Sequence, residues 1–137
     1  MTTTRVIPGI NIQWPWSRLL LSGKKTVETR SYPIPAKYIG QELAIIETPG
    51  PLGRKNGEIK TARIIGTVTF GASYQYKNLS HWKREAHLHG VSPDDRQYRF
   101  KSNSPKWAWP VLTIKQTSQA LPPPKPRGIV FARQCEL

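Results

Sequence analysis

Residues 23–30 read Gly-Lys-Lys-Thr-Val-Glu-Thr-Arg, and they follow the tripeptide Trp14-Pro15-Trp16 and a short run of leucines. A proline suits the first turn of a helix, and the leucines give that helix a buried side. Gly23 can adopt the left-handed conformation that commonly ends a helix. The sequence therefore predicts a helix from Pro15 to Ser22 that stops at this glycine.

The charged segment after Gly23 alternates as a strand does, and we expect a strand from Lys25 to Tyr32. Flanking positive charge keeps Glu28 ionised, and this carboxylate offsets the repulsion among its cationic neighbours. Two interpretations remain open, namely a functional site, or a solvated strand whose exposed ion pairs contribute roughly 0 to 1 kcal/mol. The alternation assigns the side chains to two opposite faces: Lys24, Thr26, Glu28 and Arg30 on one, and Lys25, Val27 and Thr29 on the other.

The chain carries a large excess of positive charge. Its 21 Lys and Arg residues outnumber its 8 Asp and Glu residues and give a net charge of +13. This charge is far outside the range expected of an enzyme that acts on neutral metabolites, and it favours binding to nucleic acid with steep salt dependence. The alternatives are a generally basic protein or one that docks on anionic lipid, although no basic amphipathic helix supports a lipid surface.

Length and cysteine content limit the class of protein. The 137 residues are about one domain long, so we expect residues 1–137 to form a single domain. The lone Cys135 can form no internal disulfide, which favours a reducing compartment. The N-terminal residues lead into no apolar signal core, and no stretch approaches the roughly 18 residues of a membrane span. We therefore expect a soluble, cytoplasmic protein that does not use a membrane.

Further strands are predicted from short runs rich in apolar and β-branched residues. The run 49–60 has no periodicity and is rich in turn residues and cations, so it predicts a loop. The run 121–126 predicts a polyproline connector that carries the chain back to a final strand. The predicted strands span residues 6–13, 41–48, 63–70, 106–112 and 128–131.

A helix is predicted from about Leu79 to His89, with Asn78 or Ser80 as its cap and Gly90 at its end. This helix carries all three histidines of the chain, and they are separated by six and two residues. Spacings of three or four would place two ligands on one helical face, whereas these spacings do not. We therefore expect no metal site.

Two basic segments are candidates for contacts with a nucleic-acid backbone. Arg54 and Lys55 lie in the predicted loop, which is either a solvated connection or a mobile flap that closes over phosphates. A second segment interleaves cations with aromatic rings, the combination that stacks bases and neutralises phosphates. Alternatively, its aromatic residues only anchor the segment to the core. This second segment contains Arg96, Tyr98, Arg99, Phe100 and Lys101.

An aromatic-rich proline segment, a short apolar helix and the pattern Gly-x-Lys-Thr-x-Glu-x-Arg occur in that order at Pro15, Trp16, Gly23, Lys25, Thr26, Glu28 and Arg30. In this order the chain resembles the ASCH domain family, a member of the PUA-like superfamily of RNA-associated β-barrels. Trp14 stands where the family often has Gln, and Gln13 lies one place earlier. The resemblance continues through residues 38–46, 64–70, 107–109 and 128–131.

The resemblance implies an α+β fold, a small PUA-like β-barrel of about five to six mixed strands with two or three short helices. It also implies a cationic cavity beside the charged strand. There Glu28 would accept a hydrogen bond from an exocyclic amine, Lys25 and Arg30 would meet phosphate or carbonyl oxygens, and Trp16 would stack. Together with Lys24, these are the expected ligand-binding residues.

Three functions are compatible with the resemblance. The first is an RNA-binding module that recognises a nucleotide or a modified base. The second is a ribonuclease, as some ASCH proteins are, in which Lys25 would act as a base and Arg30 would stabilise a charged phosphorane. The third is an amidohydrolase acting on N4-acetylcytidine, as in a small branch of the family. Lys25 matches that branch, but its Thr falls on Glu28 and its distant Glu falls near His87, with Glu85 close by.

No Gly-rich phosphate loop, zinc-spaced cysteine cluster or serine-hydrolase motif occurs in the chain. If the protein is an enzyme, the candidate catalytic residues are Lys25, Thr26 and Glu28. We expect no cofactor, with a divalent cation only if the protein is a nuclease. RNA or a nucleotide is the expected partner, and no obligate protein partner is evident.

Overall fold

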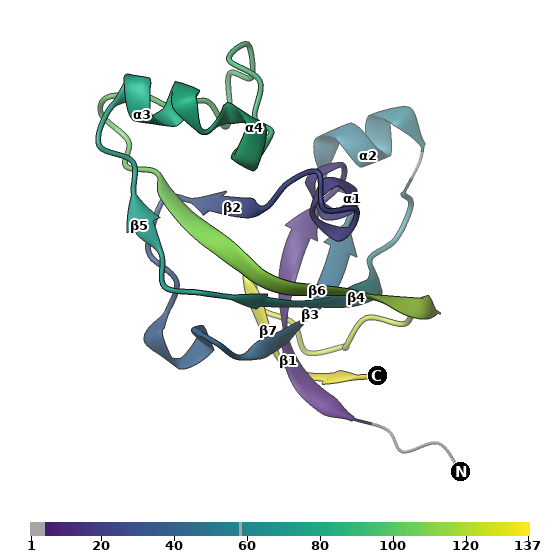
Figure 1. Ribbon diagram of the computed structural model, residues 1–137. Helices are drawn as coiled ribbons and strands as arrows, with labels where there is room; N and C mark the ends of the chain where they lie inside the picture. Colours follow the sequence, from purple (N-terminus) through teal and green to yellow (C-terminus); the bar gives the residue numbers. More distant parts are fainter. Residues whose placement is uncertain (1–4, 58) are drawn as a thin grey trace.

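The computed structural model describes residues 5–57 and 59–137, and it has an α+β fold, as expected (Figure 1). The described strands form a seven-stranded sheet, one strand more than the expected five to six. They are β1 (Val6–Gln13), β2 (Val27–Arg30), β3 (Glu42–Thr48), β4 (Arg63–Phe70), β5 (Tyr74–Gln75), β6 (Trp107–Leu121) and β7 (Phe131–Glu136). The helices are α1 (Trp16–Leu21), α2 (Gly50–Asn56), α3 (Leu79–Arg84) and α4 (Ala86–His89), with a 3₁₀ turn, η1 (Ala36–Tyr38).

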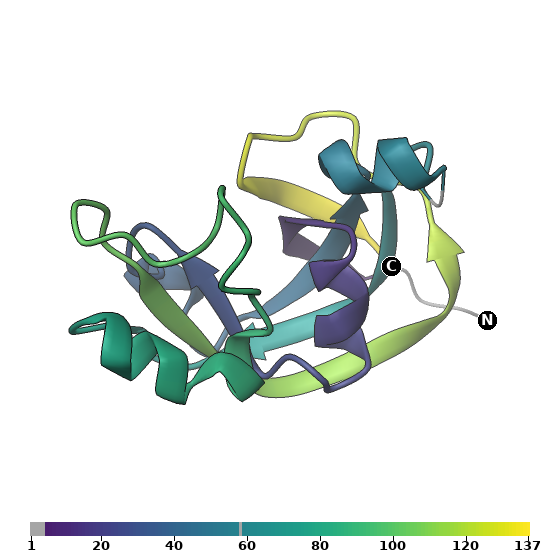
Figure 2. The ribbon, with the colours of Figure 1, turned by 90° about the horizontal axis from the view of Figure 1, so that it is seen from above.

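The strands follow the order β2-β6-β4-β3-β1-β7, and β5 pairs with β6. β1 and β3 are parallel, whereas the remaining pairs are antiparallel. The long β6 pairs with β2 through residues 107–110 and with β4 through residues 111–121, so it joins two parts of the sheet. Within the described ranges β2 and β7 end the order without pairing with each other. The expected barrel is therefore barrel-like but open, and Figure 2 shows the curved sheet from above.

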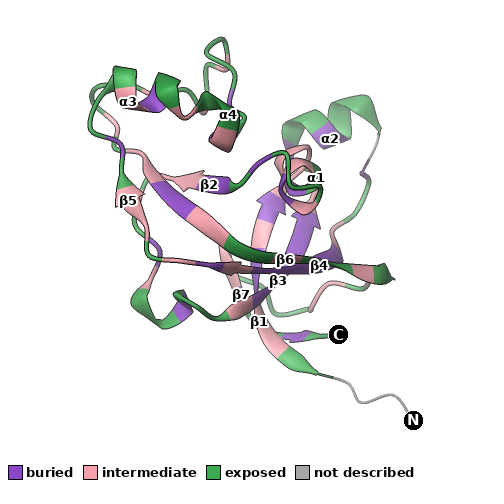
Figure 3. Cartoon of the chain, viewed as in Figure 1, coloured by how far each residue is buried: buried purple, intermediate pink, exposed green. Residues whose placement is uncertain are grey.

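The core gathers apolar side chains from β1, α1, β3, β4 and β6. Figure 3 shows buried positions concentrated on β3 and β4 and exposed ones along α2 and α3. Trp109 is completely buried, and its ring meets the rings of Phe70 and Tyr32 edge-on at 5.7 and 5.8 Å. The central residues of this core are Ile10, Ile12, Leu20, Leu43, Ile45, Val68, Phe70 and Trp109.

The prediction of a loop at 49–60 is wrong for its first half, because residues 50–56 form α2. The segment has weak helix propensity, because it contains two glycines and a proline. The proline lies in the first turn, where its missing N–H is not needed, and Gly57 ends the helix in the left-handed conformation at φ 68°. A Cβ at Gly53 would lie 3.5 Å from the Cβ of Trp14, so α2 packs closely on the chain.

The last strand starts later than expected, at Phe131 rather than residue 128. It is mostly polar, and only Ala132 and Cys135 are buried. The apolar run at 128–131 therefore predicted the final strand too early in the chain. Ile129 is 96 % exposed and belongs to the connection between β6 and β7. The helix expected at 79–89 is divided into α3 and α4, and it ends at Gly90 as predicted. Among the described residues, no helix has the length and apolar character needed to cross a membrane.

Candidate functional site

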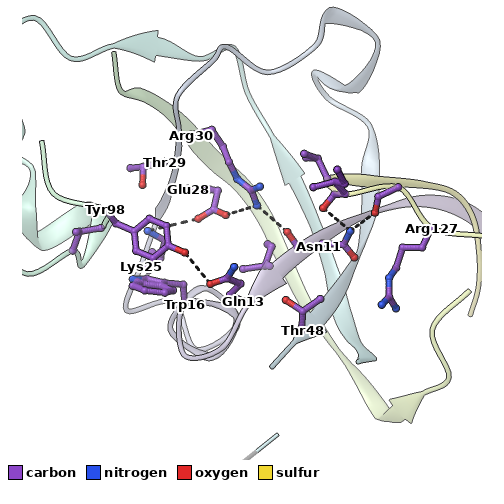
Figure 4. A pocket seen from close by; sticks show the side chains of 15 residues that line it. Asn11, Gln13, Trp16, Lys25, Glu28, Thr29, Arg30, Thr48, Tyr98 and Arg127 are labelled. Atoms are coloured by element: carbon purple, nitrogen blue, oxygen red, sulfur yellow. Dashed lines mark hydrogen bonds and ion pairs between the residues drawn. The ribbon is translucent and has the colours of Figure 1, made fainter. Parts of the chain in front are cut away.

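A cavity of about 520 Å³ opens beside β2 (Figure 4). Its walls come from β1, the start of α1, β2, the segment after α4 and the connection that precedes β7. These elements lie far apart in the sequence, and the fold brings them around one space. The cavity is lined by Asn11, Ile12, Gln13, Trp16, Lys25, Glu28, Thr29, Arg30, Thr48, Val91, Tyr98, Arg127, Gly128, Ile129 and Val130.

Lys25, Glu28 and Arg30 form an ion cluster at the cavity, which we call the charged cluster. Arg30 Nη2 donates a hydrogen bond to Glu28 Oε2 at 2.9 Å, and Lys25 Nζ lies 3.7 Å from Glu28 Oε1. Only 1 % of the Lys25 side chain, 7 % of Glu28 and 19 % of Arg30 are exposed, so water screens these charges weakly. Two cations around one carboxylate leave a net positive charge beside the cavity.

Lys25 is held in place by two neighbouring segments. Its Nζ donates to His89 O at the end of α4, and its backbone N–H donates to Leu19 O at 3.0 Å. Burial lowers the pKa of Lys25, with Arg30 acting in the same direction and Glu28 against it. The amine therefore gives up its proton more readily than an exposed lysine does, which is the property that a general base needs.

Arg30 connects the charged cluster to β1 and the core. Its Nη2 also donates to Asn11 O at 2.9 Å, and its guanidinium carbon lies 5.7 Å from the centroid of the Trp109 ring. Burial acts to lower the pKa of Arg30, but Glu28 and Tyr32 together raise it above its ordinary value. The guanidinium therefore remains charged and fixed between β2 and β1.

Trp16 and Tyr98 form an aromatic wall of the cavity, with their rings edge-to-face at 4.8 Å. The Tyr98 hydroxyl donates to Gln13 Oε1 at 2.9 Å, and the Tyr98 backbone N–H donates to Asp95 Oδ1 at 2.9 Å. Burial and the nearby Asp95 raise the pKa of Tyr98, so its hydroxyl keeps its proton at neutral pH. Such rings offer flat surfaces on which a nucleic-acid base can stack.

The structure brings Trp16 and the charged cluster together, but Lys24 and Thr26 are exposed and lie outside the cavity. The predicted alternation of side chains between two strand faces is therefore wrong for Lys24 and Thr26, because β2 begins only at Val27. Lys25, assigned to the opposite face but expected among the ligand-binding residues, lines the cavity, whereas Lys24 does not. Thr29, also assigned to that face, lines the cavity.

Two basic segments, which we call the basic flanks, each have one residue next to Gln13 of the cavity, although neither Arg54 nor Lys55 lines the cavity itself. The first is Arg54-Lys55 on α2, whose first residue, Gly50, would bring an added Cβ to 2.9 Å from Gln13 Oε1. The second contains Tyr98, which lines the cavity rather than only anchoring its segment to the core. The cations of this second flank, Arg96, Arg99 and Lys101, are exposed, as are Arg54 and Lys55.

Sequence reasoning missed the part of the cavity formed by β1 and by the connection before β7. Asn11 and Gln13 are polar residues in an otherwise apolar strand, and that interruption was a usable signal. Arg127 gave no local signal, because its place depends on how β7 pairs with β1. The sequence around it showed only a proline-rich connector.

The histidines and Glu85 serve other contacts. The His89 ring stacks on Trp82 with centroids 3.8 Å apart, and burial lowers its pKa. Glu85 accepts a hydrogen bond from the Tyr74 hydroxyl and lies 3.2 Å from His81 Nε2, away from the cavity lining. Within the described part of the chain, no group of three or more His, Cys, Asp or Glu side chains is placed to hold a metal ion.

Comparisons with known proteins bear on the family and the fold. The ASCH domain model matches residues 10–119, whereas no curated protein matches the sequence. A crystal structure of ASCH from Zymomonas mobilis has a TM-score of 0.59 and 22% identity, over 80% of this chain and 68% of that one. A serine-to-alanine ASCH mutant from the same organism has a TM-score of 0.62 and 18% identity, over 92% and 86% of the two chains.

A second mutant from that organism, tyrosine-to-phenylalanine, has a TM-score of 0.57 and 21% identity, over 82% of this chain and 73% of that one. At such identities these structural similarities show a common fold and nothing more specific. The family match is the stronger finding, because it spans most of the 137 residues and includes the charged cluster. The chain therefore belongs to the ASCH domain family.

Proposed function

We propose that this ASCH domain binds RNA and holds one nucleotide or modified base in the cavity beside β2. One observation carries the proposal: the cavity combines a nearly buried, net positive charged cluster with the aromatic wall of Trp16 and Tyr98. RNA-binding sites for unpaired bases use aromatic stacking together with polar groups that meet the base edge. The net charge of +13 adds the long-range attraction that a polyanion needs.

The charged cluster retains capacity to recognise a base edge. A carboxylate has about four lone-pair positions, and Glu28 receives one hydrogen bond, from Arg30, with Lys25 3.7 Å away. Its remaining positions can accept from an exocyclic amine. Arg30 can donate to a carbonyl or phosphate oxygen, because a guanidinium has five N–H donors.

The basic flanks would hold the RNA backbone on either side of the bound nucleotide. Both meet the cavity at Gln13, through α2 on one side and Tyr98 on the other. A strand that lies across Gln13 would therefore bring its phosphates near Arg54-Lys55 and near Arg96, Arg99 and Lys101. Such contacts contribute affinity without reading sequence.

A ribonuclease is the second candidate, and the lowered pKa of Lys25 favours it. A neutral lysine could accept the proton of an attacking hydroxyl, while Arg30 stabilises charge on phosphorus. A divalent cation bound through the phosphate oxygens would belong to this candidate only. The amidohydrolase has weaker support, because Thr26 is exposed away from the cavity and Glu85 bonds to Tyr74.

The test uses a labelled structured RNA, incubated with and without magnesium and divided between native and denaturing gels. Trp16→Ala should weaken binding roughly 5- to 150-fold, since base stacking contributes about 1–3 kcal/mol. Lys25→Ala should also weaken binding, whereas the adjacent exposed Lys24→Ala is the matched control and should change it little. Thermal unfolding of each variant checks that it is folded.

Three outcomes separate the candidates. A mobility shift without fragments, weakened by the cavity variants but not by Lys24→Ala, supports RNA binding. Fragments that disappear in Lys25→Ala would instead establish a ribonuclease centred on the charged cluster. Equal loss of affinity in Lys24→Ala and Lys25→Ala would contradict a localised site.

A further inference from the structure

One wall of the cavity comes from outside the part of the chain that matches the family. Residues 127–130 line the cavity, whereas the family match ends at residue 119. They belong to the connection between β6 and β7, which we call the C-terminal wall. The role of this wall is therefore derived from the contacts that hold it in this chain.

Asn11 of β1 fixes the C-terminal wall. Its Nδ2 donates to Gly128 O at 2.8 Å and to Ile129 O at 3.0 Å, and its backbone N–H donates to Val130 O at 2.8 Å. Its backbone carbonyl oxygen accepts from Arg30 Nη2. One residue thus ties the C-terminal wall to the charged cluster across the cavity.

Gly128 makes the wall turn tightly just after Arg127. Its N–H donates to Phe131 O at 2.9 Å, and a Cβ there would come within 2.7 Å of the same oxygen. The close approach requires glycine, because a side chain would collide with the backbone. The turn presents Arg127 at the cavity.

Arg127 lies at the end of the cavity away from the aromatic wall. Figure 4 shows Trp16 and Tyr98 on one side, Arg127 on the other, and Glu28 and Arg30 between them. Arg127 is exposed, and within residues 5–57 and 59–137 no ion pair engages it. The cavity therefore has a stacking end and a cationic end.

We infer that the cavity takes a nucleotide in one direction, with its base against Trp16 and Tyr98 and its phosphate bound by Arg127. This inference rests on the proposed function and adds to it the phosphate requirement and the orientation. Arg127 is the specificity-determining residue that selects a phosphorylated ligand over a nucleoside. Asn11 is a positioning residue that acts through the C-terminal wall.

The charges favour this assignment over the reverse orientation. Lys25 and Arg30 in the middle of the cavity are already paired with Glu28, so a phosphate there would compete with that carboxylate. Arg127 has no carboxylate partner among the described residues, so its guanidinium can form a bidentate pair with phosphate oxygens.

Calorimetric titration tests the inference with twelve probes: adenosine, cytidine, guanosine and uridine, each as the nucleoside, the 3′-monophosphate and the 5′-monophosphate. In the wild-type protein, at least one monophosphate should bind about 10-fold more tightly than its nucleoside, the size expected of one charge-assisted contact. Arg127→Ala should reduce that ratio to near one and leave nucleoside affinity unchanged. Arg133→Ala, which removes an exposed cation of β7 outside the cavity, should keep the ratio.

Asn11→Ala provides the second variant, because it keeps Arg127 but releases the C-terminal wall. This variant should also lower the ratio of monophosphate affinity to nucleoside affinity. Asn11→Gln, which keeps a side-chain N–H donor, should retain part of that ratio. A ratio that Arg127→Ala leaves unchanged would overturn the inference, and so would monophosphates that bind no better than nucleosides. In either case, RNA binding that still depends on Trp16 would leave the proposed function standing. Loss of both RNA and nucleotide binding would refute both.

Discussion

At the scale of single residues, Lys25 shows how the fold shifts the chemistry of an ordinary side chain. Its amine is almost fully enclosed, and removing a charge from water is costly unless partners replace the water. His89 O and Glu28 supply those partners, yet burial still lowers the pKa of Lys25. The neutral form is therefore more accessible here than on the protein surface.

This shift predicts a pH dependence of stability. Folded Lys25 loses its proton at lower pH than the unfolded residue, whose ordinary pKa is 10.5. Between those two values the unfolded state binds more protons, so a rise in pH favours folding. The unfolding free energy of the wild type, relative to Lys25→Met, should therefore increase as the pH rises toward 10.5. Urea unfolding at several alkaline pH values measures the difference, with Lys24→Met as the control for removing one exposed lysine.

A difference that stays constant, or decreases with pH, would show that the Lys25 amine is solvated in the folded protein. The measurement requires no ligand and no activity. It therefore examines the charged cluster independently of the function proposed for it.

At the scale of elements, α1 is joined to the sheet by a completely buried carboxylate. Glu47 of β3 accepts from Ser17 Oγ at 2.7 Å, from Arg18 Nε at 2.7 Å and from Arg63 Nε of β4 at 3.1 Å. Burial acts to raise the pKa of Glu47, but these hydrogen bonds hold it below its ordinary value. These hydrogen bonds fix α1. This helix carries Trp16 and also Leu19, whose backbone oxygen accepts from the Lys25 N–H.

Glu47→Gln should lower the unfolding free energy at pH 7 by about 1 to 3 kcal/mol, the usual cost of disrupting hydrogen bonds to a buried charged group. Because the folded pKa is depressed, the contribution is present above the ordinary value of 4.5 and is lost as the pH falls through the folded pKa. The unfolding free energies of the wild type and the variant should therefore become more similar at acid pH. Chemical unfolding at about pH 7 and about pH 3 measures this, and Glu136→Gln on the exposed side of β7 is the control.

A Glu47→Gln variant as stable as the wild type would mean that the two arginines are held by water rather than by the carboxylate. Weakened RNA binding in a folded variant would indicate that the position of α1 matters for the cavity itself.

At the scale of the whole molecule, the net charge of +13 is distributed over many exposed side chains, and only some of them lie near the cavity. Charge near the bound strand neutralises phosphates and releases counterions, whereas distant charge contributes mainly to approach. The salt dependence of RNA affinity separates the two contributions.

Replacing Arg54 and Lys55 by Gln should make the slope of log affinity against log salt less negative. The change should be about 0.7 for each phosphate of a single-stranded RNA that these two side chains neutralise in the wild type. Replacing Lys83 and Arg84 on α3 by Gln removes the same charge at a site outside the cavity lining. That control should leave the slope nearly unchanged. Equal slopes in the two double variants would contradict the assignment of α2 as a basic flank.

The sequence predicted the fold best where local chemistry acts alone. Gly23 ends α1, β4 has the expected bounds Arg63–Phe70, and the family pattern indicated the mixed fold. It failed where packing overrides propensity. α2 forms from a sequence of weak helix propensity and contacts Trp14 through Gly53, and β7 pairs with β1 although only Ala132 and Cys135 are buried.

The candidate site was predicted in part for the same reason. Three of its charged residues stand within six positions of one another, so a motif could reveal them. Which side chains of this segment face the cavity could not be predicted, because this depends on the residue at which β2 begins to pair with β6. Lys25 precedes that residue. Arg127 reaches the cavity only after the chain has passed through β6 and turned toward β7, and no local pattern encodes that path.

The connection that carries Arg127 also has a practical consequence for engineering. Residues 122–130 join Leu121, paired with Ile64, to Phe131, paired with Ile10, and they form no rung of the ladder themselves. We expect residues 122–126 to tolerate exchange while the sheet and the charged cluster stay intact, because the hydrogen bonds from Asn11 to this connection begin only at Gly128. Libraries that vary the length and sequence of this segment, and keep the turn at Gly128, offer a direct route to domains with altered ligand preference.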